Sequence, residues 1–303
     1  MRGMNERGAN TGAGSDRLVG FTIPRCHARG RMVRIGPVLD RILAAHAYPA
    51  PIQQLLAEAL VLTALMGGLL KREGSQLTMQ AQTTGGVVEL LVCDYRDGEL
   101  RGYVQHDFAR LADLGEEPSL PRLFGDGHLA ITFDLAETNQ RYQGIVPLEG
   151  NSLSAAVEAY FGQSEQVPTL IRTAVEAGGM RNIAGGLLVQ HLPDGEEGRE
   201  RLHVRGNHPQ WDHVALLAHS TQSDELVDAN LPLEGLVWRL FHEEPEVRVQ
   251  DPVALSRGCR CSIMHFEEVL ARFPKEDRRD MRNENGVILV DCAFCSREFA
   301  IQD

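Results

Sequence analysis

The chain has 303 residues, of which 43% are apolar, and its formal net charge is −12. This length suits two domains, or one large domain with an appendage, and the acidic balance disfavours non-specific binding to nucleic acid or to an anionic membrane surface. No basic start followed by an apolar run marks the N-terminus, so we expect no secretory signal, a cytoplasmic location and reduced cysteines.

Residues 1–16 are polar and glycine-rich, which predicts a disordered tail. The apolar positions in residues 38–47 have helical spacing, and Pro51 is well suited to the first turn of a second helix. This second helix is apolar on nearly all sides through Leu70, although it contains Glu58. It is short for a membrane span, so we predict a core helix that is covered from more than one direction.

From Gln76 onward the apolar period changes to two, which predicts β-strands. A strand is also expected within residues 18–34, and Ser152 is predicted to cap a short helix that ends at Phe161. The other predicted strands are residues 76–82, 87–95, 100–105, 128–134, 141–147, 170–176 and 183–191. Antiparallel strands around a buried helix define an α+β domain, which we expect over residues 17–205.

Residues 206–258 carry nine acidic and three basic side chains, so their net charge is −6. We predict three short helices here, the second of which begins with a capping box made by Thr221 and Asp224. The apolar residues that indicate the first and third helices are Val214, Leu216 and Leu217, and then Leu236, Val237, Leu240 and Phe241. Helices this short are marginal in water, so we expect a helical linker that folds weakly against the core, with Trp238 docked on it.

Four cysteines form two close pairs, Cys259-Arg260-Cys261 and Cys292-Ala293-Phe294-Cys295, which are separated by 30 residues. Two such pairs can bring four thiolates to one tetrahedral zinc ion. Residues 259–303 are too few to bury a large core, so metal binding would supply most of their folding free energy. We therefore predict a zinc domain over residues 259–303, with a helix within 262–272 and one Zn²⁺ held by Cys259, Cys261, Cys292 and Cys295.

Basic side chains at Arg257, Arg260 and Arg297 are expected to moderate the negative charge of the four thiolates. His265 is an alternative ligand, but four cysteines are available, so we expect it on a helix face. The site is either purely structural or responsive to oxidants, because zinc keeps thiols deprotonated and nucleophilic toward peroxide or hypochlorous acid. A disulfide within Cys-X-Cys would close a small strained ring and would be reduced readily again.

The two remaining cysteines differ in their sequence context. Cys93 lies in an apolar strand and is expected to be buried and inert. Cys26 lies between Arg25 and His27, which would lower its pKa, but a free structural thiol is the favoured interpretation. No glycine pattern of a phosphate-binding loop and no Ser-His-Asp set is recognisable, so we expect no enzymatic activity.

The cysteine pattern, together with segments that precede it, resembles the heat-shock protein 33 family of redox-regulated chaperones. The matching segments include RYQGIV at residues 141–146, LEG at 148–150, SEQVPT at 164–169 and WRLFHEE at 238–244. The resemblance covers nearly everything after the N-terminal tail, and the mass of 33.5 kDa agrees with it.

This resemblance implies an ATP-independent holdase of the cytoplasm, bound to one zinc ion and largely inactive when reduced. It implies that oxidation forms the disulfides Cys259–Cys261 and Cys292–Cys295 and releases zinc. The zinc domain and the linker would then unfold, and the core would associate as a homodimer that holds unfolding client proteins. This chain departs from the family pattern in its extended N-terminal tail and in having only eight residues after Cys295.

Two other classes of protein are weighed against this one. A zinc-ribbon adaptor or nucleic-acid-binding protein is disfavoured because residues 259–303 show no one-sided basic patch. A thiol-disulfide oxidoreductase is disfavoured because its Cys-X-X-Cys motif is expected in a βαβ context, whereas Cys292 and Cys295 follow a predicted strand near the C-terminus.

Overall fold

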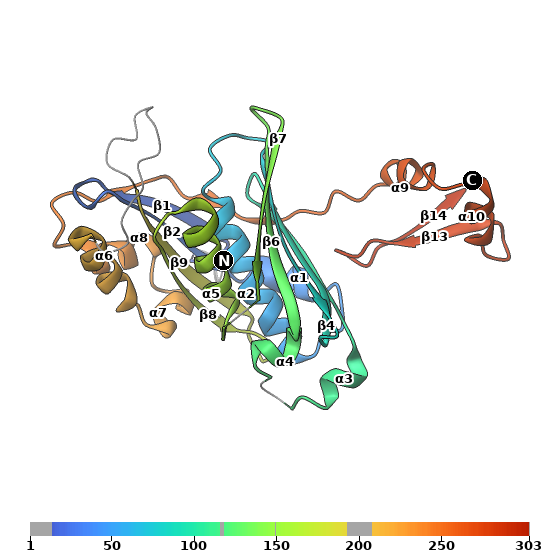
Figure 1. The fold of residues 1–303 in the computed structure, drawn as a ribbon, viewed down its shortest axis with the longest axis horizontal. Helices are drawn as coiled ribbons and strands as arrows, with labels where there is room; N and C mark the ends of the chain where they lie inside the picture. The colour runs from blue at the N-terminus through green and yellow to red at the C-terminus, as the bar shows by residue number, and fades with distance from the viewer. Residues whose placement is uncertain (1–13, 116–117, 149, 193–207, 303) are drawn as a thin grey trace, which may run out of the picture.

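Two six-stranded β-sheets form the body of the protein in the computed structural model, which describes residues 14–115, 118–148, 150–192 and 208–302 (Figure 1). The first sheet contains β1 (Arg17–Ile23), β2 (Ala28–Ile35), β8 (Thr169–Glu176), β9 (Ile183–His191), β10 (Arg248–Val249) and β11 (Val253–Ala254). The second contains β3 (Gln76–Thr84), β4 (Val88–Arg96), β5 (Glu99–His106), β6 (Asp126–Leu135), β7 (Gln140–Pro147) and β12 (Ser256–Arg257).

The strand order is β10-β1-β2-β9-β8 in the first sheet, where β11 also pairs with β1, and β12-β5-β4-β3-β6-β7 in the second. Among the described strands of both sheets, the pairing of β12 with β5 is parallel and the other pairings are antiparallel. The predicted linker therefore supplies the outermost strand at one edge of each sheet, whereas β8 and β7 form the other edges.

The helix α2 (Ala50–Gly67) lies between the two sheets and contacts strands of both. Its length and composition would allow it to cross a membrane, but 72% of the helix is buried inside the protein. Glu58 is the one charged residue of this helix, and its Oε1 accepts hydrogen bonds from the amide and the hydroxyl of Ser154. The prediction of a buried core helix is confirmed.

The strands predicted from residue 76 onward are all present, with ends within two residues of the predicted ones. Residues 17–35 form a hairpin, β1 and β2, rather than a single strand. The helices α1 (Pro37–Leu43) and α5 (Leu153–Tyr160) are also in their expected places, and Ser152 Oγ accepts from the amide of Ala155 as a cap. Sequence periodicity did not reveal the short helices α3 (Phe108–Ala112) and α4 (Leu120–Phe124).

Three helices of the predicted linker cover the face of the first sheet that is turned away from α2 (Figure 1). They are α6 (Pro209–His219), α7 (Ser223–Val227) and α8 (Leu233–Phe241). Phe241 is fully buried, and its ring centroid lies 5.5 Å from that of Phe21 on β1. Because both faces of this sheet are covered, every residue of β9 is buried.

Two predictions about these linker helices are wrong. The capping box of α7 is made by Gln222 and Glu225, not by Thr221 and Asp224. Thr221 is buried, and its amide donates to the last turn of α6, so it ends one helix instead of beginning the next. Trp238 is not docked on the core, because it is 65% exposed on the outer side of α8.

A fully buried arginine joins the first sheet to the linker. Arg34 on β2 donates from Nε to the carbonyl of Leu226 at 2.8 Å, from Nη1 to that of Leu231 at 2.7 Å, and from Nη2 to that of Glu225 at 2.8 Å. These three carbonyls belong to α7 and the residues just after it. The guanidinium therefore satisfies backbone acceptors that would otherwise be buried without a donor.

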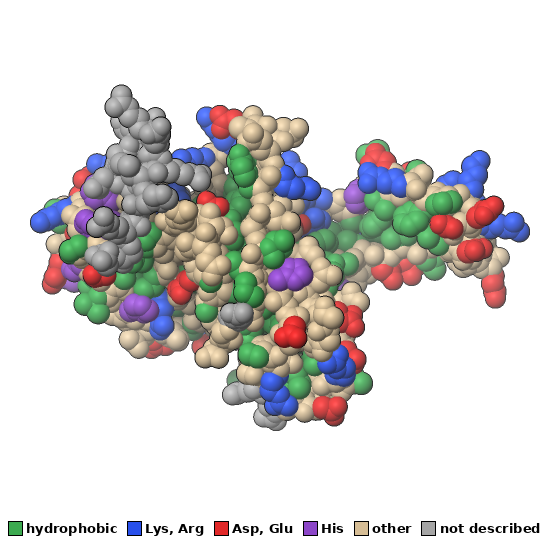
Figure 2. Space-filling view, in the orientation of Figure 1, with side chains coloured by type: hydrophobic (Ala, Val, Ile, Leu, Met, Phe, Trp, Pro, Cys, Tyr) green, Lys and Arg blue, Asp and Glu red, His purple; other side chains and the backbone are tan. Residues whose placement is uncertain are grey.

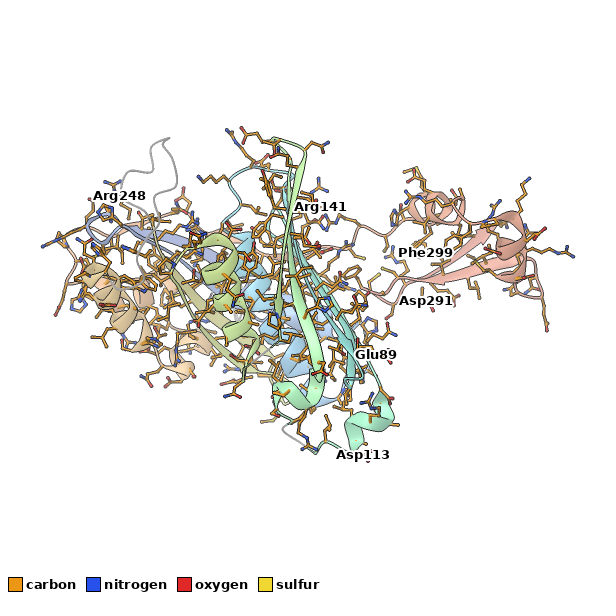
Figure 3. All side chains as sticks on the ribbon, in the orientation of Figure 1. Glu89, Asp113, Arg141, Arg248, Asp291 and Phe299 are labelled. Carbon is orange, nitrogen blue, oxygen red and sulfur yellow. The ribbon has the colours of Figure 1, made fainter. Side chains whose placement is uncertain are left out.

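The residues after β12 form a small unit that extends away from the two sheets (Figure 1). It contains α9 (Ile263–Leu270), α10 (Lys275–Asp280) and a hairpin of β13 (Val287–Asp291) and β14 (Glu298–Gln302), so the predicted helix between the cysteine pairs is confirmed. Phe299 projects from β14, and its ring centroid lies 5.0 Å from that of Phe266 on α9 (Figure 3). The buried side chains of this unit are Leu270, Ile288, Cys292, Phe299 and Ile301.

The two ends of the predicted core domain are only partly described. Residues 1–13 of the predicted tail, and the predicted boundary between residues 205 and 206, lie outside the described residues. Asp16 is described, and its carboxylate accepts hydrogen bonds at 2.9 Å from the amides of Gly36 and Val38 at the start of α1. The chain is therefore fixed to the first sheet and α1 from this residue onward.

Candidate metal centre

The second cysteine pair lies in the tight turn between β13 and β14. The carbonyl of Cys292 accepts from the amides of Cys295, at 3.2 Å, and Ser296, at 2.8 Å, and the amide of Cys292 donates to the carbonyl of Arg297 at 3.0 Å. Ser296 has a φ of 53°, a left-handed conformation that reverses the chain. The turn thereby brings both thiols of the pair to one place.

The first cysteine pair follows directly after β12, and β5 fixes its direction. The amide of Gly258 donates to the carbonyl of Leu100 at 2.9 Å, which continues the parallel pairing up to Cys259. A Cβ atom on Gly258 would lie 2.5 Å from Cβ of Glu99, so this close approach requires glycine. The strand therefore delivers the Cys-X-Cys segment to the edge of the second sheet.

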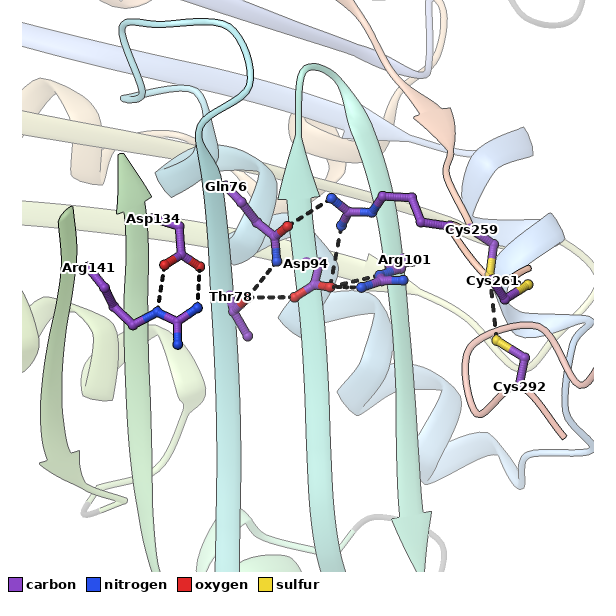
Figure 4. A network of polar contacts seen from close by, with 10 residues as sticks. Gln76, Thr78, Asp94, Arg101, Asp134, Arg141, Cys259, Cys261 and Cys292 are labelled. Carbon is purple, nitrogen blue, oxygen red and sulfur yellow. Dashed lines mark hydrogen bonds and ion pairs between the residues drawn. The ribbon is translucent and has the colours of Figure 1, made fainter. Parts of the chain in front are cut away.

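The structure brings all four predicted ligands together. The Sγ atom of Cys259 lies 3.3 Å from that of Cys261 and 3.6 Å from that of Cys292 (Figure 4). The Sγ atom of Cys261 lies 3.5 Å from that of Cys295. All four sulfurs lie within 4.8 Å of one another. Sulfurs around a tetrahedral zinc ion are separated by about 3.8 Å, since each Zn–S bond is about 2.3 Å long. The residues present therefore fit such an ion.

The electrostatics of these thiols also favour a cation. Burial alone would raise the pKa of Cys259, but hydrogen bonds from the amide of Cys261 and from the neighbouring thiols lower it to about 7. Burial, together with hydrogen bonds shared with the other thiols, raises the pKa of Cys261 and of Cys292. Ionisation of one sulfur thus opposes ionisation of its neighbours, and four thiolates at these distances require a positive ion among them.

His265 does not join the sulfurs. Its side chain is exposed on α9, and its amide donates to Ser262 Oγ, the cap of this helix. Among the described residues, the four cysteines are the one group of three or more potential ligands close enough to share a metal ion. The expected position of His265 on a helix face is confirmed.

The two other cysteines are buried and lie away from this cluster. Burial raises the pKa of Cys93, in agreement with an inert thiol. Burial, followed by a hydrogen bond from the thiol to Glu244, raises the pKa of Cys26 to about 11. Arg25 lowers this pKa, as expected, but the loss of solvent and the carboxylate of Glu244 outweigh its effect, so the thiol does not become reactive.

Arg260, which we expected to moderate the thiolate charge, binds the second sheet instead. Its Nη1 donates to Gln76 Oε1 at 2.8 Å, and its Nη2 lies 3.6 Å from Asp94 Oδ2. Asp94 is nearly buried on β4, where it also accepts from Thr78 at 2.7 Å and pairs with Arg101 at 2.6 Å (Figure 4). A carboxylate held this far from water attracts a second guanidinium strongly, because solvent screens the attraction only weakly.

The spacer of the second pair also contacts this sheet. The Cζ atom of Arg101 lies 4.0 Å from the centroid of the Phe294 ring, and the ring of Tyr103 meets Phe294 edge-on with centroids 4.9 Å apart. Sequence reasoning did not find these contacts. Their partners are far apart in the chain, and no local pattern connects them.

Comparisons with known proteins show which family the chain belongs to. A family model described as Hsp33 protein matches residues 16–302. The 33 kDa chaperonin of Caulobacter vibrioides is 38% identical over 306 residues, which cover 98% of each chain. The 33 kDa chaperonin of Nitrosococcus oceani is 34% identical over 286 residues, which cover 94% of this chain and 90% of that one. These relatives are named as chaperones, and this chain belongs to the Hsp33 family.

A solved structure supports the fold independently. The crystal structure of a 33 kDa chaperonin (heat shock protein 33 homolog) from Thermotoga maritima matches with a TM-score of 0.75 over 95% of each chain. Its sequence is 20% identical to this one, so the match concerns the fold. The predicted α+β class is confirmed, and chaperone function follows from membership of the family.

Proposed function

We propose that this chain is a redox-regulated, ATP-independent holdase that binds one Zn²⁺ in its reduced state. The observation that carries the proposal is the cluster of four sulfurs, all within 4.8 Å of one another, in a unit with few buried side chains. Cys259, Cys261, Cys292 and Cys295 would hold the ion. The bound ion would neutralise thiolate charge and join the two cysteine turns.

Oxidation would form one disulfide within each pair, Cys259–Cys261 and Cys292–Cys295. In each step two thiolates give up two electrons, and one molecule of hydrogen peroxide takes these electrons and two protons to become two molecules of water. The sulfurs of Cys259 and Cys261 are 3.3 Å apart, so this pair needs little movement to bond. Because thiolates are the zinc ligands, their loss releases the ion.

Release of zinc would free the C-terminal unit and then the linker. The helices α6, α7 and α8 cover apolar side chains of the first sheet, including Val19, Phe21, Ile23, Met32, Leu187 and Val189. Departure of these helices would expose a contiguous apolar face, to which apolar segments of unfolding client proteins can bind. The same face would let two oxidised chains associate as a homodimer in the cytoplasm.

We propose no enzymatic activity and no binding to nucleic acid or membranes. The turn with Cys292 and Cys295 joins two strands of a hairpin, whereas the redox motif of thiol-disulfide oxidoreductases opens a helix after a strand. Residues 259–303 carry seven basic and nine acidic side chains, and both kinds are interspersed over this unit in Figure 2. Neither observation favours the alternative functions.

The test compares reduced, zinc-bound protein with peroxide-oxidised protein in the aggregation of a thermally unfolding client without ATP. We expect the oxidised protein to suppress light scattering at a few equivalents per client and the reduced protein to have little effect. Zinc release is followed in the same samples with a coloured chelator. Equal suppression by both states would contradict the redox switch, and suppression by neither would contradict the holdase.

A further inference from the structure

One spacer residue from each cysteine pair contacts the same face of the second sheet. Arg260 reaches side chains on β3 and β4, and Phe294 reaches side chains on β5. Cross-strand register places Thr78, Asp94 and Arg101 side by side on this face. The two cysteine turns contact five side chains, which we call the core docking surface. They are His46, Gln76, Asp94, Arg101 and Tyr103.

The contact of Arg260 is well shielded from water. The side chain of Asp94 is 5% exposed and that of Arg260 is 30% exposed. A guanidinium beside a nearly buried carboxylate is attracted more strongly than one on an open surface, and its planar fork reaches Gln76 and Asp94 at once. This contact therefore does more than an exposed ion pair to hold the first cysteine turn.

The contact of Phe294 depends on the same group of charges. The guanidinium of Arg101 lies 4.0 Å from the centroid of the Phe294 ring, a cation–π distance, and it also pairs with Asp94 at 2.6 Å. The ring of Tyr103 also contacts the ring of Phe294, and the angle between the two ring planes is 86°. This is the edge-to-face arrangement that aromatic rings prefer. Arg101 thus contributes to the binding of both cysteine turns.

His46 binds the turn that carries Cys292 and Cys295. Its Nε2 lies 2.8 Å from the carbonyl of Ala293, and its Nδ1 lies 3.1 Å from Ser296 Oγ. The neutral tautomer with its proton on Nε2 satisfies both contacts, since Nε2–H donates to Ala293 and Nδ1 accepts from Ser296. The turn is therefore held at positions on both sides of Phe294.

We propose that Arg260 and Phe294 are the residues through which the joined cysteine turns hold the linker on the core. The inference rests on the proposed function for the oxidant signal, whereas the docking itself requires only that the four cysteines be held together. Two modest contacts presented by one rigid body reinforce each other, because each keeps the other at a high effective concentration. When the two turns separate, each contact has to form alone.

The docking acts on the linker through β12. This strand pairs with β5 over two residues only, Ser256 with Glu99 and Arg257 with Leu100, and so short a ladder is weak by itself. Cys259 follows two residues after the strand, so docking of Arg260 keeps β12 in register. In the linker just before it, β10 and β11 lie on β1. Loss of docking therefore loosens the linker from its C-terminal end.

The experiment uses the reduced, zinc-loaded full chain with Arg260→Ala and Phe294→Ala combined. We expect zinc to remain at one ion per chain, because all four cysteines are kept. We expect tryptic cleavage at Arg239 and Arg248, located by mass spectrometry, to speed up roughly tenfold, since two cooperating contacts are lost. The matched control is Arg272→Ala combined with Phe273→Ala, which removes an exposed arginine and an exposed phenylalanine after α9 and should leave the cleavage rate unchanged.

A variant of the core decides the result independently of the cysteine turns. Tyr103→Ala alters the core docking surface alone, and we expect it to speed cleavage less than the double variant. Wild-type cleavage rates in the Tyr103→Ala variant would overturn the inference. This holds even if the double variant loses zinc and its own cleavage rate can no longer be interpreted. If cleavage accelerates as expected but oxidised wild-type protein fails to suppress client aggregation, the docking stands and the holdase proposal fails.

Discussion

The body of the protein and its C-terminal unit are stabilised in different ways. The body buries one long helix between two sheets, and the apolar cluster around it draws on nearly every strand of the second sheet and several of the first. The C-terminal unit has five buried side chains in its cluster, and one of these is Cys292. The other three cysteines of the candidate site lie, half-buried, against the same cluster. The small apolar core of this unit and the four sulfurs of the candidate site are thus contiguous.

This difference underlies our proposal that the C-terminal unit responds to oxidants while the body does not. Apolar burial in the body does not depend on oxidants, because its two buried cysteines, Cys26 and Cys93, are thiols whose pKa values are raised by burial. The C-terminal unit depends on sulfurs whose oxidation state can change. The linker is intermediate in its stability. Its helices are short, and they are stabilised by packing on an apolar face of the first sheet.

The largest effect is expected from removal of the sulfurs. Replacing Cys259, Cys261, Cys292 and Cys295 by serine should abolish zinc binding and unfold residues 259–302, because structural zinc sites contribute about 10–16 kcal/mol of apparent binding free energy. The body should remain folded. Zinc analysis and amide hydrogen exchange measure both effects. A variant that retains stoichiometric zinc would contradict the ligand assignment, and unfolding of α2 would contradict the independence of the two regions.

A cavity in the body should have the reverse effect. Leu60 is fully buried on α2, so Leu60→Ala should lower the free energy of unfolding by about 2–5 kcal/mol. Zinc affinity of the folded protein should not change, because Leu60 belongs to the apolar cluster of the body and not to that of the C-terminal unit. Urea unfolding and competition with a zinc chelator provide the two measurements. A weaker zinc affinity at unchanged fold would show that the regions are coupled through the core.

The contact between Arg34 and the linker tests the intermediate region. Arg34→Met keeps the length of the side chain but leaves three carbonyls without donors, so we expect a loss of about 2 kcal/mol. The loss should appear first as faster hydrogen exchange in α7. Arg34→Lys is the matched control and should be intermediate, because an ammonium lacks the fork of a guanidinium. Unchanged exchange in α7 would show that Arg34 does not hold the linker.

The smallest effect concerns the charge inside the body. Burial raises the pKa of Glu58 above its ordinary value of 4.5, although hydrogen bonds from Ser154 and Thr173 oppose this shift. The folded state thus binds this proton more tightly than the unfolded state, so stability due to Glu58 is greatest below pH 4.5 and is lost as the pH rises through the folded pKa. Glu58→Gln should therefore stabilise the protein at pH 8, and the gain should shrink toward pH 5. A gain that is independent of pH in urea titrations would refute this account.

Sequence patterns predicted those features of the fold that repeat locally. The period of two located β3 to β9, and the leucines of α2 identified the central helix, because each pattern follows from burial of one or more faces. The spacing of the cysteines predicted their cluster, since two close pairs leave few other arrangements. These signals depend on neighbours in sequence.

The features that were missed depend on distant partners. The strands β10, β11 and β12 have two residues each, which is too short for any period. Arg34 resembles a surface residue in sequence, because arginines are rarely buried completely. Trp238 was expected to be docked because it is large and apolar, but the buried stripe of α8 is already provided by Leu236, Val237 and Phe241. The docking of Arg260 and Phe294 required the tertiary structure.

The end of the linker also determines where the two sheets stop. Residues 248–257 provide the outermost strands at β1 in one sheet and at β5 in the other. If this one segment is lifted, both β1 and β5 present rows of unpaired amides and carbonyls to solvent. Such edges pair with any extended backbone, whatever its side chains. Departure of this one segment would thus add a second, long open edge to each sheet, which already ends at β8 or β7 on its other side. Pairing at such an edge depends on the main chain of a partner and not on its sequence.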